Sequence, residues 1–125
     1  MTLKEILKGA VEGTGDVAKS LMDTSADLVK EGSHDIGEIF GAVIDLGNEG
    51  VIDVTTGVKD VYVGAVNALK DSGHSTEEAV EKVTTKAEEA VGNIGEEGLE
   101  SVGEAAKKGI HEAKEIIKEP FKKEE

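Results

Sequence analysis

A glycine-rich stretch near the start of the chain has the residue types of a nucleotide-binding loop. Residues 13 to 18 read GTGDVA, which matches the GxGxxA pattern of dinucleotide sites. In such sites the glycines follow a strand and open a helix at the pyrophosphate. The residues before this stretch, LKEILKGAVE, have helical spacing and not the alternation of a strand. We therefore expect a helix irregularity here and no bound cofactor.

The three histidines, His34, His74 and His111, are the side chains best suited to bind a transition metal. No two of them have the spacing of ligands that share one helical turn. We expect solvated surface histidines and no metal site, with a site assembled between subunits as the remaining alternative.

Carboxylates are abundant, but general acid and base catalysis needs two groups that converge in a dry pocket. Here the acids recur at intervals of eleven residues, about 16 Å apart along a helix that rises about 1.5 Å per residue. Serine and threonine lack a base at helical spacing, and Tyr62 is expected to pack on an apolar face. We expect no catalytic residue and a protein that is not an enzyme; weak Ca²⁺ binding is the outside alternative.

The charge balance limits the partners. The chain has 27 acidic residues against 14 basic ones, all lysine, for a net charge of −13. Nucleic acid is therefore an unfavourable partner, and anionic membrane surfaces are disfavoured. There is no cysteine, and the longest run of apolar residues and glycine, IFGAVI at 39–44, is far short of a membrane span. No secretory signal is evident, so a cytoplasmic location is expected.

The elements that would position these residues follow an eleven-residue (undecad) repeat. A frame that starts at Leu3 tiles residues 3 to 123 without insertion, and apolar residues gather at its first, fourth, fifth, eighth and ninth places. The third place, which includes Asp60, is nearly always charged and is expected at the polar margin. Eleven residues make three turns at about 3.67 residues per turn, so the apolar stripe stays on one side of a nearly straight helix. The sequence predicts an all-α protein of long amphipathic helices, as a helical hairpin or an extended rod, and oligomeric.

Helix-ending signals divide the chain. We expect N-terminal helical segments over residues 1–73, with breaks near 13–15, 31–35 and 47–50, a long C-terminal helix over 74–119 that Pro120 ends, and a charged tail over 120–125. Ser75 with Glu78 forms a capping box after Gly73, and Thr2 with Glu5 forms another. Residues 36–71 are rich in β-branched side chains, yet their apolar residues follow helical spacing, so helix is predicted there.

Sixteen glycines weaken an isolated helix, each by about 1 kcal/mol relative to alanine. Packing against a helix or adsorption to an apolar surface must offset this loss. Gly47, Gly50, Gly95 and Gly98 fall on the predicted apolar face, where they add little burial but allow two backbones to approach. This favours packing of helix on helix over lipid.

The undecad frame and the stretches VEKVTTKAEEAVGNIGEE and GVKDVYVGAVNALKD resemble the late embryogenesis abundant proteins with eleven-residue repeats and the synucleins. That resemblance implies conditional folding, with helix formed on lipid or on drying. The frame also resembles right-handed undecad coiled coils, which implies stable oligomers.

Two functions follow. The first is a structural or interaction protein that self-associates, as a dimer or higher homo-oligomer, or scaffolds a larger protein assembly through its apolar helix face. The second is an amphipathic protein of a lipid, droplet or granule surface, or a stress protectant. The predicted interaction face consists of Ile36, Ile39, Phe40, Val43, Val54, Val58, Val61, Val80, Val83, Val91 and Ile94.

Overall fold

Six helices make up the computed structural model, which describes residues 2–12, 17–32, 35–96 and 100–123. They are α1 (Leu3–Glu12), α2 (Val17–Glu31), α3 (Ile36–Asn48), α4 (Val54–Asp71), α5 (Thr76–Glu96) and α6 (Glu100–Lys123). Within the described ranges no strand occurs. The predicted all-α class is therefore confirmed, and the β-branched segment 36–71 forms α3 and α4, with residues 49–53 between them outside any helix.

Side-chain caps start several of these helices. At α5 the amide of Glu78 donates to Ser75 Oγ at 3.2 Å, and the amide of Ser75 donates to Glu78 Oε1 at 3.2 Å. At α1 the amide of Glu5 donates to Thr2 Oγ1 at 3.2 Å, and the threonine hydroxyl donates to Glu5 Oε1 at 3.0 Å. The two capping residues predicted from the sequence are thus in place, and they pair amides that the first turn of a helix leaves without a partner.

Asp53 starts α4 in the same way, although the sequence analysis did not single it out. Its carboxylate accepts hydrogen bonds from the amide and the hydroxyl of Thr56, at 3.0 and 2.9 Å. These bonds, the amide bond first, lower the pKa of Asp53 below its ordinary value, with help from Lys108 and Lys59. Asp35 caps α3 by accepting from the amide of Gly37 at 3.1 Å.

Glycines with positive φ end two of the helices in the middle of the chain. Gly50 follows α3 with φ of +85°, and Gly73 follows α4 with φ of +105°. A side chain at either position would be strained, because L-residues rarely adopt this conformation. The expected breaks near 13–15, 31–35 and 47–50 each fall between two helices. Residues 13–16 themselves, with the GxGxxA glycines, lie outside the described residues.

The C-terminal half of the chain differs from the prediction of one helix over 74–119, which is wrong. Two helices, α5 and α6, take its place, separated by residues 97–99. A single straight helix would leave the second half of the apolar stripe in water, whereas α6 buries Ala106, Ile110 and Ala113 against the rest of the chain. Pro120 does not end α6, which continues to Lys123; a proline removes one donor, and only three helical residues follow it.

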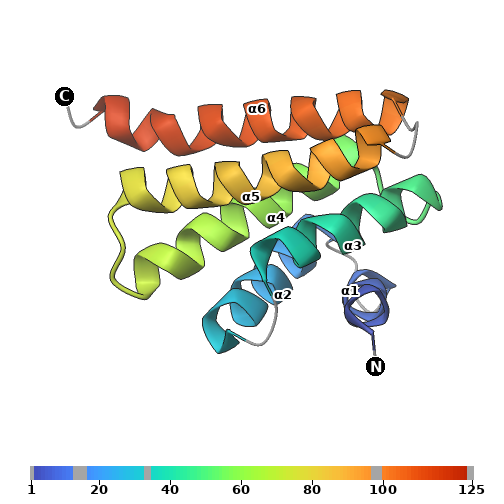
Figure 1. The fold of residues 1–125 in the computed structure, drawn as a ribbon. Coiled ribbons are helices and arrows are strands. Elements are labelled where there is room, and N and C mark those ends of the chain that lie inside the picture. Colours follow the sequence, from blue (N-terminus) through green and yellow to red (C-terminus); the bar gives the residue numbers. More distant parts are fainter. Residues whose placement is uncertain (1, 13–16, 33–34, 97–99, 124–125) are drawn as a thin grey trace.

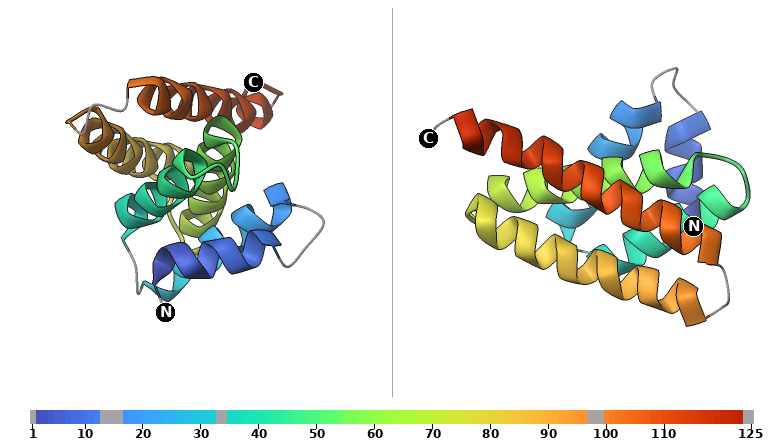
Figure 2. Two further views of the ribbon diagram at one scale, coloured as in Figure 1. Left: turned by 90° about the vertical axis from the view of Figure 1, so that its right-hand side faces the viewer. Right: turned by 90° about the horizontal axis from the view of Figure 1, so that it is seen from above.

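The helices fold back on one another, and α4 lies at the centre (Figure 1). Helices α4, α5 and α6 lie side by side with the chain direction reversing at each connection, and each of the three contacts the other two. On the other side α2 and α3 pack against α4, and α1 packs against α2 and α3 (Figure 2). The structure therefore shows neither the extended rod nor a single two-helix hairpin.

The central position of α4 explains how much of it is buried. Eleven of its 18 residues are buried, on several sides of the helix. Asp60, at a third place of the repeat and expected at the polar margin, is only 3% exposed. That expectation was wrong because four other helices contact α4, so a margin residue on it does not reach solvent.

Candidate functional site

The predicted interaction face converges on one core. Its members on α3 and α4, together with Val83 and Val91 on α5, are buried against other helices of the same chain, and Val80 is half-buried. The side chain of Ile94 lies outside the part of the chain that the structure describes. The structure thus brings the predicted residues together inside one molecule.

The core also contains residues that the predicted face omitted. Eight that occupy the same five places of the predicted frame are Leu7, Val11, Leu21, Leu28, Tyr62, Ala106, Ile110 and Ala113. The apolar pattern could have indicated these eight. Others, such as Ala42 and Leu46, are buried at places of the frame that were not predicted to be apolar.

Tyr62 packs at the junction of α3, α4 and α5, as expected of a core side chain. Its ring lies 6.4 Å from that of Phe40, centroid to centroid. Its hydroxyl donates to the carbonyl of Val80 at 3.3 Å and makes a short hydrogen bond with the hydroxyl of Thr84. Burial raises the pKa of the phenol, partly offset by the bond from Thr84. The hydroxyl of Tyr62 therefore links α4 to α5.

The α4–α6 seam is a contact at which the backbones of two helices approach closely. We define it as Thr55, Val58 and Lys59 of α4 with Ala105, Gly109 and Glu112 of α6. The hydroxyl of Thr55 donates to the carbonyl of Ala105 at 3.0 Å. A Cβ on Gly109 would lie 2.5 Å from the carbonyl oxygen of Thr55, and Lys59 Nζ lies 3.8 Å from Glu112 Oε1. Glycine is required because the backbones themselves meet.

A second glycine has the same role where α2 crosses α4. A Cβ on Gly64 would lie 2.5 Å from the carbonyl oxygen of Met22. Of the glycines predicted to allow close approach, Gly47 does contact Val54, while Gly50 has open space around it. Gly95 and Gly98 lie outside the residues whose surroundings the structure describes. Close approach therefore occurs at Gly47, one of the predicted positions, and also at Gly64 and Gly109, which were not predicted.

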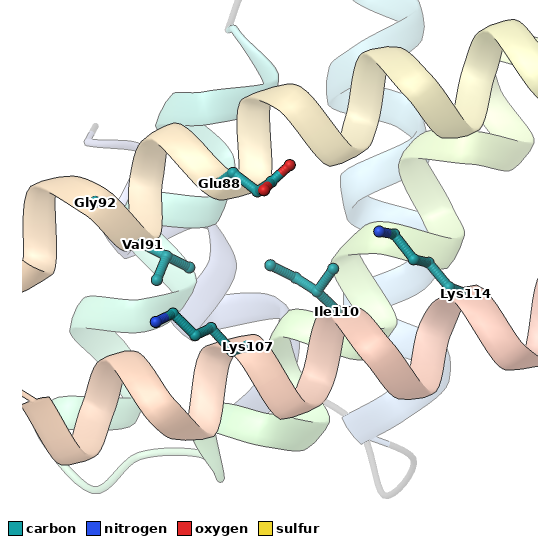
Figure 3. Close-up of a pocket in the computed structure, with 6 residues that line it drawn as sticks. All are labelled: Glu88, Val91, Gly92, Lys107, Ile110 and Lys114. Atoms are coloured by element: carbon teal, nitrogen blue, oxygen red, sulfur yellow. The ribbon is translucent and has the colours of Figure 1, made fainter.

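A groove of about 380 Å³ separates α5 from α6. Figure 3 shows Val91 and Ile110 facing each other across it, with Glu88, Lys107 and Lys114 around them and Gly92 at one side. Both apolar side chains are only 7% exposed, and the charges around them are of both signs. The groove offers neither convergent catalytic groups nor a field of one sign. The groove shows that α6 packs less closely against α5 here than it packs against α4 at the seam.

A second hollow of about 450 Å³ lies between α2 and α4, and Asp23, Asp27, Lys30 and Asp71 are among its lining. Lys30 pairs with Asp71 at 3.1 Å, which balances part of this acidity. Across the described ranges, no group of three or more His, Cys, Asp or Glu side chains is placed to hold a metal ion. His74 and His111 are exposed, in the α4–α5 connection and on α6, and His34 lies outside the described residues.

Comparison with known proteins yields no relative: no family model, curated protein or solved structure matches this chain. The resemblance to undecad-repeat proteins therefore rests on period and composition. None of the described helices combines the length and apolar character needed to cross a bilayer.

Proposed function

We propose that this chain is a non-enzymatic interaction protein that self-associates through its undecad helix faces and so organises a protein assembly. The observation that supports the proposal is the α4–α6 seam, a contact within one chain that shows how helices of this sequence pack on one another. Contact there depends on a glycine in one helix and a backbone carbonyl in the other. Such a contact selects a helix of defined sequence. A lipid surface has no carbonyl at a fixed place and would gain nothing from Gly109.

The side chains that could take part in acid–base chemistry instead bond to other parts of the fold, which supports a packing role for the chain. Tyr62 uses its hydroxyl to join α4 and α5. Asp53 and Glu78 use their carboxylates to cap helices, which lowers the pKa of both. Each of these groups has a structural partner, so the proposal assigns them to building helices and to joining them.

Net charge sets the conditions for association. Two copies at −13 each repel one another, and this repulsion is screened over about 10 Å at 0.1 M salt. Self-association of this chain is therefore expected to strengthen as salt is raised. An interface that depended on ion pairs between copies would show the opposite trend.

The test is sedimentation velocity of the full chain over a range of protein and salt concentrations. A mass above that of one chain that increases with salt supports the proposal. A monomer under all conditions overturns it, and helix content that increases only when vesicles are added would favour the surface-binding alternative.

A pair of variants tests whether the buried face is responsible. Val61→Asp places a carboxylate at a site with no exposure, so we expect it to dissociate or unfold the protein. Asn67→Asp adds the same charge at an exposed position of the same helix and is the matched control. Unchanged mass and helicity in Val61→Asp would contradict the reasoning.

A further inference from the structure

We propose that the groove between α5 and α6 binds a small amphiphile that has one aliphatic chain and a carboxylate head, such as a medium-chain fatty acid. The head pairs with the ammonium group of Lys107, and the chain lies over Val91 and Ile110. This site is independent of the proposed self-association, because none of the residues that form the α4–α6 seam lines the groove.

The size of the groove suits a single aliphatic chain. Its volume is about 380 Å³, within the range of about 300–1,000 Å³ that is typical of small-molecule sites. Val91 and Ile110 face each other across it, and α5 and α6 contact one another (Figure 3). An α-helix is about 10–12 Å across with its side chains. A partner helix is therefore too thick to enter between α5 and α6, whereas an extended aliphatic chain is not.

The lining of the groove is apolar below its rim. Val91 and Ile110 are each only 7% exposed, so the surface between the two helices is nearly dry. Lys107 and Lys114 also line the groove, and a lysine side chain presents an aliphatic stem below its charged head. Gly92 has no side chain, and a Cβ there would meet nothing within 4 Å, which leaves the α5 wall open. An aliphatic chain in the groove therefore leaves water and meets apolar atoms on both sides.

The charges around the groove decide which head group fits. The chain has a net charge of −13, yet the groove has two ammonium groups against one carboxylate, that of Glu88. Elsewhere in the fold lysines pair with carboxylates, as Lys30 does with Asp71. Across the residues that the structure describes, neither Lys107 nor Lys114 forms such an ion pair. The groove is thus a locally cationic place on an acidic protein, and it complements an anion.

The direction of the two helices places the carboxylate at Lys107. Helices α5 and α6 run in opposite directions (Figure 1), so Glu88, one turn before Val91, and Lys114, one turn after Ile110, lie toward the same end of the groove. Lys107 lies at the other end, beside Val91 (Figure 3). Its single positive charge matches the single negative charge of a carboxylate. A phosphate monoester, with a charge of about −1.5 to −2 at pH 7, fits less well.

Titration of the nitrogen-15-labelled full-length chain with sodium decanoate tests the site through amide chemical shifts. Decanoate is kept below the concentration at which it forms micelles, so that the protein meets single molecules. We expect a saturable shift of the amides of Val91, Gly92 and Ile110, with the helix content in circular dichroism unchanged. Octanoate should bind more weakly, since each methylene group that leaves water strengthens binding by up to about fourfold.

Three outcomes of the titration would overturn the site. The first is the absence of a saturable shift at these amides. The second is a rise in helix content with shifts throughout the chain, which indicates adsorption along the helices and not binding in the groove. The third is equal affinity for decanoate and decyltrimethylammonium, because these have similar aliphatic chains and opposite charges.

Substitution of Lys107 tests the head group. Lys107→Gln should weaken decanoate binding about fivefold, as the loss of an exposed ion pair does at the upper end of its range. Lys108→Gln is the matched control, because it removes the same charge from the next residue of α6, which is also exposed and does not line the groove. Equal affinities of the two variants for decanoate would overturn the assignment of the carboxylate to Lys107.

Substitution of Gly92 tests the groove itself. Gly92→Leu adds an aliphatic side chain to the lining without a clash at its Cβ, so it should fold and should prevent saturable binding of decanoate. Gly9→Leu is the matched control in α1, where the glycine is exposed and a Cβ also meets nothing within 4 Å. Circular dichroism checks that both variants are helical. If Gly92→Leu binds decanoate as tightly as Gly9→Leu does, the ligand does not occupy the groove.

Discussion

The α4–α6 seam makes a sharp prediction for the substitution Gly109→Ala. The new Cβ would lie 2.5 Å from the Thr55 carbonyl oxygen and 3.0 Å from Val58 Cβ. Carbon and oxygen atoms in contact normally stand about 3.3 to 3.6 Å apart. Helix α6 must therefore move away from α4 by roughly 1 Å, or the backbone must deform.

The magnitude follows from three opposing contributions. Overpacking of a close contact costs about 1–3 kcal/mol. Displacement of α6 also weakens the Thr55 to Ala105 hydrogen bond, a loss of about 1 kcal/mol. The better helix propensity of alanine returns about 1 kcal/mol. We expect Gly109→Ala to lower the free energy of unfolding by about 1–3 kcal/mol.

Gly103→Ala is the matched control for this prediction, because it makes the same change in the same helix. A Cβ on Gly103 meets nothing within 4 Å, so only the propensity gain of about 1 kcal/mol remains. Urea unfolding followed by circular dichroism measures both variants, with the slope against urea as the check that the unfolded states are alike. If Gly109→Ala proves as stable as Gly103→Ala, α4 and α6 do not meet through their backbones and the seam is refuted.

Three further predictions concern single polar groups. Ser25→Ala should raise the free energy of unfolding by about 1 kcal/mol, since the Ser25 hydroxyl is fully buried and accepts and donates no hydrogen bond; a loss of stability in urea unfolding would contradict this. Tyr62→Phe should lower it by about 1 kcal/mol because the bonds to Val80 and Thr84 are lost. In the unchanged chain, ultraviolet titration should place the phenol above its ordinary pKa. Hydrogen bonds with Ser75 lower the pKa of Glu78, so its contribution to stability is present above the ordinary glutamate pKa and is lost as pH falls through the lower, folded-state value. Glu78→Gln should therefore differ from the unchanged chain at neutral pH and converge with it in acid; a constant difference would count against the linkage.

The helical class could be predicted from the sequence because apolar residues recur at helical spacing. Leu7, Leu28 and Ile110 lie at apolar places of the predicted frame, and all are core residues; Leu46 and Ala68 lie at its eleventh place and are core residues as well. The end of α4 near Gly73 and the start of α5 at Ser75 could also be predicted from the sequence, because positive φ and helix capping each favour specific residue types. These are local effects, and a local pattern suffices to find them.

What could not be predicted depends on how the helices meet. The apolar pattern over 74–119 is the same whether these residues form one long helix or two helices that fold back on each other. The spacing of apolar residues therefore does not predict that α5 and α6 are separate helices. Asp60 is buried because α4 is surrounded, which no residue of α4 reveals alone. Gly64 and Gly109 differ from the other glycines only in which carbonyl stands opposite them. The sequence could therefore predict that the candidate site is a close contact between helices, but not which residues form that contact.

The position of Tyr62 has a practical consequence. It is the only tyrosine in a chain without tryptophan, so it alone dominates the intrinsic fluorescence of the protein. Its hydroxyl bonds to α5 while its ring belongs to α4, and hydrogen bonding of a phenol to a carbonyl alters its emission. Departure of α5 from α4 would thus change the emission directly, with no added dye. The kinetics of helix opening in this molecule can be followed from one native side chain.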